Sequence, residues 1–124
     1  MRANRGRDTV PELAVRRALH ARGLRYRVDH PLPFDRRRRA DIAFTRAKVA
    51  VFIDGCFWHG CPQHGATPRT NTEFWRAKIE RNRARDCDTT ERLEAMGWIV
   101  LRFWEHTPTL AVVEAVVGAV SRSR

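Results

Sequence analysis

The sequence contains no long apolar run and only three cysteines among its 124 residues. A helix that crosses a bilayer needs about 20 consecutive apolar residues, and no segment approaches that length. The N-terminal residues are basic and polar with no apolar segment behind them, so we expect no signal peptide. Three cysteines cannot all pair in disulfides, which favours a reducing compartment and metal-bound or free thiols. We therefore expect a cytoplasmic protein without membrane contact, folded as a single domain over residues 1–124.

Acidic residues are also scarce, because 14 Asp and Glu stand against 24 Lys and Arg, a formal net charge of +10. Most of the positive residues are arginines, and the densest run is Arg36, Arg37, Arg38 and Arg39. The guanidinium group matches phosphates and base edges with a planar fork of donors. Such a surplus on a compact domain is typical of nucleic-acid binding. A solvated basic surface is the alternative, and the four tryptophans favour the nucleic acid.

Hydrophobic spacing and turn signals predict an α/β fold, a mixed β-sheet flanked by helices in the order α-β-β-β-α-β-α. After a basic arm, residues 1–8, a helix runs from the cap Thr9 to the stop at Gly23. The later helices are expected at residues 72–96, ended by Gly97, and at 107–124. The strands are expected at residues 24–28, 40–44, 48–53 and 98–104, with a loop at 29–39. The apolar face of the long helix should comprise Phe74, Ala77, Ile79, Leu93 and Met96.

One stretch, VAVFIDGCFWHGCPQH, combines a buried strand with a high density of reactive side chains. Its first residues are β-branched and aromatic, as suits a buried strand, and this run stops at Asp54 and Gly55. The ten residues after Asp54 include two cysteines, two histidines and a Phe-Trp pair. We interpret the stretch as a strand that delivers a carboxylate and an imidazole to a site braced by a metal.

Cysteines and histidines in this stretch predict a structural zinc site. The candidate ligands are Cys56, Cys61 and His64, joined by His106 just after the last expected strand. Structural zinc takes four such ligands in a tetrahedron, often from a tight turn and a distant segment. The spacing is looser than in the standard finger pattern, so simple buried thiols are the alternative. Cys87, in the long helix, is expected to be a free thiol.

Carboxylates on two neighbouring strands predict a magnesium site. Asp41 lies in the second expected strand and Asp54 ends the third, so both reach one end of the sheet if these strands pair. Hard oxygen ligands suit Mg²⁺ next to a phosphate. Glu12 could join them or only cap its helix, and Asp41 could instead be a solvated acid. His59 could take a proton from water beside a metal-bound phosphate, although a lone histidine is more often structural.

Aromatic residues beside the basic surface suggest contact with bases. Phe57 and Trp58 are adjacent between a glycine and the expected zinc loop, and Trp75 lies near the start of the long helix. Exposed rings can stack on bases or wedge between base pairs. Packing in the core is the alternative, above all for Trp75.

Five phrases together resemble a known family. In order they are PELAVRRALHARGLRYRV, RRRADIAF, VAVFIDGCFWHGC, TEFWRAKIERNRARD and LEAMGWIVLRFWEH. They resemble the very short patch repair (Vsr) mismatch endonucleases, and GCFWHG followed by TEFW is the most specific part. The resemblance implies a restriction-endonuclease-like core of the PD-(D/E)xK superfamily with a structural zinc. It also implies Mg²⁺-dependent nicking of duplex DNA 5′ to the thymine of a T:G mismatch.

The resemblance also implies roles for individual residues. Asp41 matches the essential metal-binding aspartate, Glu12 the acid of the first helix, and His59 the catalytic histidine. Asp86 matches an acid of the long helix that could orient His59, and Asn82 could support the same site. The wedge that enters the mismatch matches Phe57, Trp58 and Trp75, and the zinc positions match Cys56, Cys61, His64 and His106.

One departure from the family pattern and one from the superfamily motif shape the expected mechanism. Many members have histidine where this chain has Asp54, so we expect Asp54 to bind Mg²⁺ together with Asp41. The lysine of the superfamily motif is missing, which leaves His59 as the expected base. Besides nicking at T:G, the alternatives are another mismatch or foreign DNA as target, and a zinc-stapled DNA-binding module that does not cut. We expect a monomer associated with the nucleoid, with Arg36, Arg37 and Arg38 on the DNA.

Overall fold

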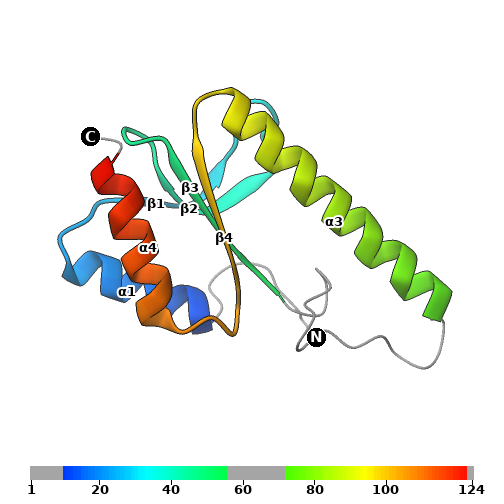
Figure 1. Ribbon diagram of the computed structural model, residues 1–124, viewed down its shortest axis with the longest axis horizontal. Helices are drawn as coiled ribbons and strands as arrows, with labels where there is room; N and C mark the ends of the chain where they lie inside the picture. The colour runs from blue at the N-terminus through cyan, green and yellow to red at the C-terminus, as the bar shows by residue number, and fades with distance from the viewer. Residues whose placement is uncertain (1–9, 56–71, 123–124) are drawn as a thin grey trace.

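The computed structural model describes residues 10–55 and 72–122, which form four strands and three helices (Figure 1). In chain order the elements are α1 (Val10–Ala21), β1 (Arg27–Pro31), β2 (Arg39–Phe44), β3 (Val49–Asp54), α3 (Thr72–Ala95), β4 (Ile99–Trp104) and α4 (Thr109–Arg122). The predicted order of elements and the mixed α/β class are confirmed. The basic arm 1–8 and the predicted cap Thr9 lie outside the described residues.

The strands form one sheet in the order β1-β2-β3-β4. β1 and β2 are antiparallel, as are β2 and β3, whereas β4 runs parallel to β3. The tight connection between β2 and β3 allows the antiparallel pair, and the long α3 crossover allows the parallel one. The C-terminal end of β3 therefore lies beside the C-terminal end of β4 and the N-terminal part of β2.

Helices cover both faces of the sheet, α1 and α4 on one side and α3 on the other (Figure 1). Alternation along β3 divides the core accordingly. Val49 and Val51 pack with α1 and α4, while Ala50 and Phe52 pack with Leu93 of α3. The larger core cluster comprises Val15, Leu19, Ile42, Phe44, Val49, Val51, Val112, Val113, Val116, Ala119 and Val120.

The first strand lies three residues later than predicted, at Arg27–Pro31 and not at 24–28. Leu24 and Tyr26 pack against the core, and the Tyr26 hydroxyl donates a hydrogen bond to the Arg16 carbonyl at 2.9 Å. The strand continues into the predicted loop and ends at Pro31, which is paired with Arg39. Proline is tolerated here because β1 is an edge strand.

The predicted apolar face of α3 is mostly wrong. Leu93 is fully buried, but Phe74 is 57% exposed and Met96 is 44% exposed. Ala77 is also exposed, and Ile79 is only half-buried. For Phe74, Ala77 and Ile79 the reason is visible in Figure 1, where the N-terminal half of α3 extends past the described strands of the sheet. Met96 follows the last residue of α3 and lies in the turn before β4.

The helix ends follow the sequence signals more closely. Gly23 and Gly97 have φ angles of 81° and 88°, the left-handed conformation that glycine adopts freely after a helix. The last helix is shorter than predicted, since Pro108 precedes it and Thr109 is its first residue. Within residues 10–55 and 72–122, none of the helices combines the length and apolar character needed to cross a membrane.

Candidate active site

Asp41 is fixed at the point where the pairing of β2 with β3 ends. The paired residues run from Phe44↔Val49 to Ile42↔Val51. One residue further, the Asp41 Oδ2 atom accepts a hydrogen bond of 2.6 Å from the Ile53 main-chain N–H. In a regular antiparallel ladder this N–H would donate to a backbone carbonyl, but here it donates to the Asp41 carboxylate. This contact ties the acid of β2 to the end of β3.

Glu12 of α1 lies against Asp41. Its side chain is 2% exposed, and its carboxyl group is hydrogen-bonded to that of Asp41. Arg16, one turn later on α1, donates a hydrogen bond from Nη2 to the Glu12 Oε1 atom at 2.9 Å. Glu12 is therefore part of the acidic site and not only a residue of the first helical turn, which sequence reasoning left open. Whether it binds a metal stays a prediction.

The environment of Asp41 favours its protonated form. Burial raises the pKa of Asp41 from 3.8 to about 8, and the negative charges of Glu12 and Asp54 act in the same direction. The hydrogen bond from Ile53 acts against them. A divalent cation would relieve the repulsion among these three carboxylates, and Mg²⁺ is commonly held by one or two carboxylates plus waters. The chemistry of the donor set therefore fits Mg²⁺.

Asp54 is held by a residue that sequence reasoning missed. Nη1 of Arg102, on β4, lies 3.2 Å from both carboxylate oxygens of Asp54. Arg102 is paired with Phe52 in the parallel register, so it faces the α3 side of the sheet as Asp54 does. A signal was present, since a single arginine interrupts the apolar strand IVLRFW. A charged side chain that is largely buried needs a partner, and Asp54 supplies it.

The predicted zinc site falls largely outside the described residues. Cys56, Cys61 and His64 lie there, as do His59, Phe57 and Trp58. His106 is described and exposed, in the turn that follows β4. That turn lies beside the end of β3, because the Glu105 N–H donates a 3.0 Å hydrogen bond to the Asp54 carbonyl. No group of three or more His, Cys, Asp or Glu side chains in the described part of the chain is arranged to hold a metal ion. Both metals stay predictions.

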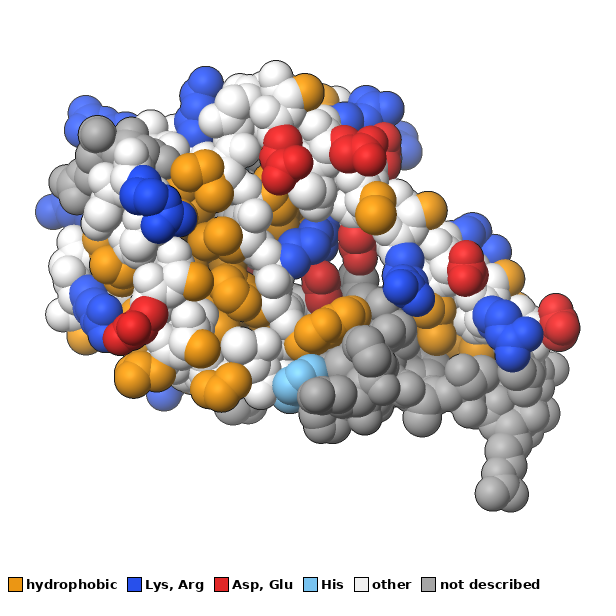
Figure 2. Space-filling model, in the orientation of Figure 1, with side chains coloured by type: hydrophobic (Ala, Val, Ile, Leu, Met, Phe, Trp, Pro, Cys, Tyr) orange, Lys and Arg blue, Asp and Glu red, His pale blue; other side chains and the backbone are white. Residues whose placement is uncertain are grey.

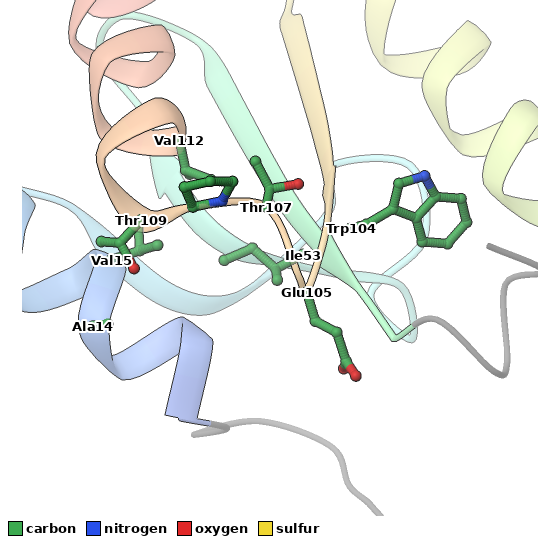
Figure 3. Close-up of a pocket in the computed structure, with 9 residues that line it drawn as sticks. Ala14, Val15, Ile53, Trp104, Glu105, Thr107, Thr109 and Val112 are labelled. Carbon is green, nitrogen blue, oxygen red and sulfur yellow. The ribbon is translucent and has the colours of Figure 1, made fainter. Parts of the chain in front are cut away.

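A pocket of about 240 Å³ lies behind this site, on the side of α1 and α4 (Figure 3). Ile53, whose N–H holds Asp41, forms one wall, and Val15 and Val112 lie opposite. Glu105 is the acidic residue of its lining. Among the described residues the lining has a carboxylate and two threonines, Thr107 and Thr109, but no basic group, so it offers a phosphate no positive charge. We therefore expect DNA at the acidic side chains and not in this pocket.

The aromatic pair at the start of α3 is partly exposed. Trp75 is half-buried and packs edge-to-face on Phe74, with ring centroids 5.1 Å apart and an interplanar angle of 80°. Exposed basic residues follow on the same helix, which Figure 2 shows projecting from the body with alternating basic and acidic side chains. They are Arg76, Arg81, Arg83 and Arg85. The predicted contact of Trp75 with bases stays a prediction.

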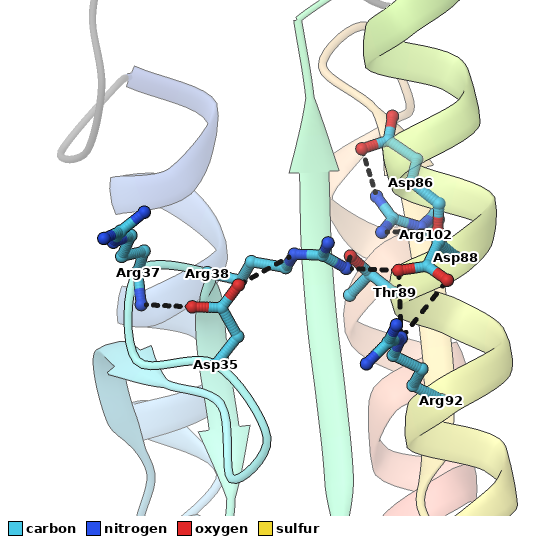
Figure 4. Close-up of polar contacts among 8 residues, drawn as sticks. All are labelled: Asp35, Arg37, Arg38, Asp86, Asp88, Thr89, Arg92 and Arg102. Atoms are coloured by element: carbon cyan, nitrogen blue, oxygen red, sulfur yellow. Dashed lines mark hydrogen bonds and ion pairs between the residues drawn. The ribbon is translucent and has the colours of Figure 1, made fainter.

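The arginine run contains two side chains that point into solvent and two that the protein holds. Arg39 donates a hydrogen bond from Nη1 to the Asp29 carbonyl at 2.9 Å, and Arg38 contacts α3 (Figure 4). Arg36 and Arg37 are exposed. The Arg38 Nε atom lies 3.3 Å from Asp35 Oδ2, and its Nη1 atom lies 2.7 Å from Asp88 Oδ2. Nη1 also donates a hydrogen bond to the Thr89 hydroxyl at 3.1 Å. Hydrogen bonds from Arg38 and then Arg92 hold the pKa of Asp88 below its ordinary value. Arg38 thus ties the loop before β2 to α3, and its predicted DNA contact stays a prediction.

This division can be tested with two alanine variants. Arg37→Ala should leave the melting temperature unchanged and lower the slope of log K against log salt for DNA binding by about 0.9. Arg38→Ala should instead lower the melting temperature by about 3 °C, because the loop loses its ion pairs to α3. Thermal unfolding and fluorescence anisotropy over a salt series measure the two effects. An equal decrease of the salt slope for Arg38→Ala would show that Arg38 leaves its internal partners when DNA binds. An unchanged melting temperature for Arg38→Ala would show that its ion pairs to α3 do not stabilise the fold.

Comparison with known proteins identifies the family. Residues 1–64 match the family model of the DNA mismatch endonuclease Vsr. The chain belongs to this family. It is 50% identical over 122 residues to the type II nicking enzyme V.NaeI of Lentzea aerocolonigenes. The matched residues cover 97% of this chain and 74% of that protein. It is 39% identical over 110 residues to the DNA mismatch endonuclease Vsr of Escherichia coli K12, with 85% of this chain and 66% of that protein covered.

A third relative agrees with these two. The type II nicking enzyme V.NmeDIP of Neisseria meningitidis serogroup C is 48% identical over 108 residues, 86% of this chain and 71% of that protein. The family and the enzyme class predicted from the sequence are confirmed, so the protein is a Vsr-family DNA nicking endonuclease. The acidic cluster of Asp41, Glu12 and Asp54 is its candidate active site.

Proposed function

We propose that the protein is a Mg²⁺-dependent mismatch endonuclease that nicks duplex DNA 5′ to the thymine of a T:G pair. The observation that carries the proposal is Asp41 itself, which is held by the Ile53 N–H where β2 and β3 part and is coupled electrostatically to Glu12 and Asp54, with a pKa of about 8. A perturbed carboxylate among other carboxylates is typical of a metal-binding catalytic site. The name of the Escherichia coli relative, a DNA mismatch endonuclease, supports the choice of substrate.

In this proposal Asp41 holds the cation together with Asp54 or a main-chain carbonyl, and Glu12 lies next to them. Bound there, Mg²⁺ would polarise the scissile phosphate and offset the charge that develops on it. The Ile53 N–H keeps the Asp41 carboxylate in place. His59 accepts the proton of the attacking water, and cleavage leaves a 3′-hydroxyl and a 5′-phosphate. Asp86, with Asn82 one turn earlier on α3, would support His59 from the helix.

The remaining assignments concern zinc and the DNA. Cys56, Cys61, His64 and His106 would hold a structural zinc, since four protein ligands leave no position for substrate. This zinc would link residues 56–64 to the turn after β4, because His106 lies in that turn. Phe57, Trp58 and Trp75 would form the wedge at the mismatch. The exposed Arg36 and Arg37 suit the phosphate backbone.

A second candidate function has support from the other relatives. V.NaeI and V.NmeDIP are named type II nicking enzymes, without mention of a mismatch. A different mismatch, or foreign DNA, is therefore the alternative target for this nuclease. The third alternative, a DNA-binding module that does not cut, is not favoured, because the chain belongs to a family of endonucleases.

A panel of duplexes tests the proposed function. Each duplex carries one of the possible mismatches or none, in several sequence contexts, and each strand is end-labelled separately. With Mg²⁺ we expect the T-containing strand of T:G duplexes to be nicked at least about tenfold faster than any other, a difference of about 1.4 kcal/mol. Equal cutting of matched and T:G duplexes would exclude mismatch repair, and a preference for another mismatch would support the second candidate. Full nicking in the presence of a chelator of divalent cations would exclude the role of Mg²⁺.

A further inference from the structure

Arg102 occupies an unusual position for a charged residue. It lies in β4, next to β3 in the sheet, and its side chain is only 22% exposed. The guanidinium carbon lies 4.2 Å from the centroid of the Phe52 ring, which is itself buried. The ring holds the guanidinium plane over the sheet by a cation–π contact. Arg102 therefore has little freedom to move away from the end of β3.

Each part of the guanidinium group has its own partner. Nη1 lies 3.2 Å from both oxygens of Asp54, and Nε donates to the Thr90 hydroxyl at 3.1 Å. Nη2 donates to the main-chain carbonyl of Asp86 at 3.3 Å, and the Asp86 carboxylate lies 3.7 Å from Nη1 (Figure 4). Asp54 is on β3, whereas Thr90 and Asp86 are on α3. One arginine thus joins three elements at the acidic cluster.

We propose that Arg102 is a positioning residue of this active site, which fixes the Asp54 carboxylate and sets the spacing between the end of β3 and α3. The inference rests on the proposed function, because Asp54 is there a candidate metal ligand. Arginine is suited to this role, since its fork can satisfy several acceptors at fixed angles, which a lysine ammonium on a flexible stem cannot. Arg102 also places a positive charge against Asp54, which limits the total negative charge that the cation would meet.

A purely structural ion pair is the alternative, and the chain offers a matched example of one. Arg92 lies on α3 and pairs with Asp88 at 3.1 Å, and its side chain is 57% exposed. Like Arg102 it contacts an aromatic ring, with its guanidinium 5.4 Å from the centroid of Phe34. Within the described residues the side-chain contacts of Arg92 are with Asp88 and the Phe34 ring, so it links the same helix to the body of the protein away from the acidic cluster. Losing Arg92 should therefore change stability without changing the dependence on Mg²⁺.

The test compares Arg102→Lys, Arg102→Gln and the control Arg92→Gln. Single-turnover nicking is measured over a Mg²⁺ series, on the duplex that the wild type cuts fastest. Both Arg102 variants lose the fork, so their rates at saturating Mg²⁺ should fall by about 10–100-fold, as is usual when the support of a metal ligand is removed. Only Arg102→Gln removes the positive charge, which leaves more negative charge at the site for the cation. The half-saturating Mg²⁺ concentration should therefore decrease for Arg102→Gln and not for Arg102→Lys. Arg92→Gln should match the wild type in both quantities.

A second measurement does not depend on nicking. The rise in melting temperature on adding Mg²⁺ should be larger for Arg102→Gln than for the wild type, and unchanged for Arg102→Lys. The wild type's choice of duplex and its need for Mg²⁺ test the proposed function, whereas the ratio of variant to wild type tests Arg102. If Arg102→Gln fails to fold, Arg102→Lys and Thr90→Val, which removes the acceptor of Nε, still decide the question. Wild-type rates and Mg²⁺ dependence in the folded Arg102 variants would overturn the proposal.

Discussion

Replacing Asp41 with asparagine is expected to reduce nicking by at least about a thousandfold, equivalent to about 4 kcal/mol of lost transition-state stabilisation. Asparagine has nearly the same shape, and its amide oxygen can still accept the hydrogen bond from the Ile53 N–H. It cannot supply the negative charge that holds a divalent cation against a phosphate. The loss should therefore fall on the chemical step, with DNA binding changed by no more than a few fold.

The measurement is single-turnover nicking of an end-labelled duplex, together with anisotropy of the same duplex in Ca²⁺ or without metal. Asp29→Asn is the matched control. Asp29 lies on β1 between Val28, which pairs with Ile42, and His30, which pairs with Ala40. It therefore lies opposite Asp41 of β2. Its φ angle of 47° is one that asparagine tolerates well. Asp29→Asn should nick as the wild type does, and comparable nicking by Asp41→Asn would remove Asp41 from the mechanism.

The position of the acidic cluster could be predicted because it depends on local signals. Asp41 and Asp54 belong to adjacent strands joined by a tight turn, so antiparallel pairing brings them to one end of the sheet. There the negative charges of Glu12 and Asp54 both raise the pKa of Asp41. The role of Glu12 could not be settled in this way, since a first-turn glutamate serves as a cap or points inward depending on how the helix docks. Its burial is set by the contact of α1 with the sheet and α4.

Features that depend on packing between distant segments were missed. The sequence of α3 gives a weak apolar pattern, and nothing in it shows that the N-terminal half of the helix extends beyond the sheet. The four consecutive arginines look alike, yet Arg38 reaches an acid fifty residues away in sequence, on α3. Arg102 was missed because its partners Asp54, Asp86 and Thr90 come from two other elements. Interactions of this kind follow from topology, which sequence spacing does not contain.

The metal-free protein is expected to lose stability as the pH rises from about 4 to about 8, with Asp41 as the main cause. In the unfolded chain this carboxyl ionises near 3.8, whereas in the folded protein burial raises its pKa to about 8. Between these values the folded state holds a proton that the unfolded state has released, so each added pH unit favours unfolding. One such proton contributes at most about 1.4 kcal/mol per pH unit. The stabilisation is complete below the unfolded pKa and is lost by the folded pKa.

Asparagine at position 41 removes the titrating proton and keeps the shape, so it isolates this contribution. In urea denaturation without metal, Asp41→Asn should be more stable than the wild type at pH 8, and the gap should shrink as the pH falls towards 4. Asp29→Asn shows how much slope remains when a neighbouring acid is replaced instead. Equal slopes for wild type and Asp41→Asn would show that Asp41 has an ordinary pKa in the folded protein.

Magnesium gives the same experiment a second use. If Asp41 ligates the cation, Mg²⁺ and the proton compete for one carboxylate, so added Mg²⁺ should stabilise the wild type far more at pH 8 than at pH 5. Asp41→Asn should gain little at either pH, and the stability gap between the two proteins at pH 8 should narrow or reverse. The buried repulsion among Asp41, Glu12 and Asp54 would then be a cost that the folded protein bears without metal because the same charges bind the cation. An equal gain from Mg²⁺ in both proteins would place its binding site elsewhere, whatever the nicking assay shows.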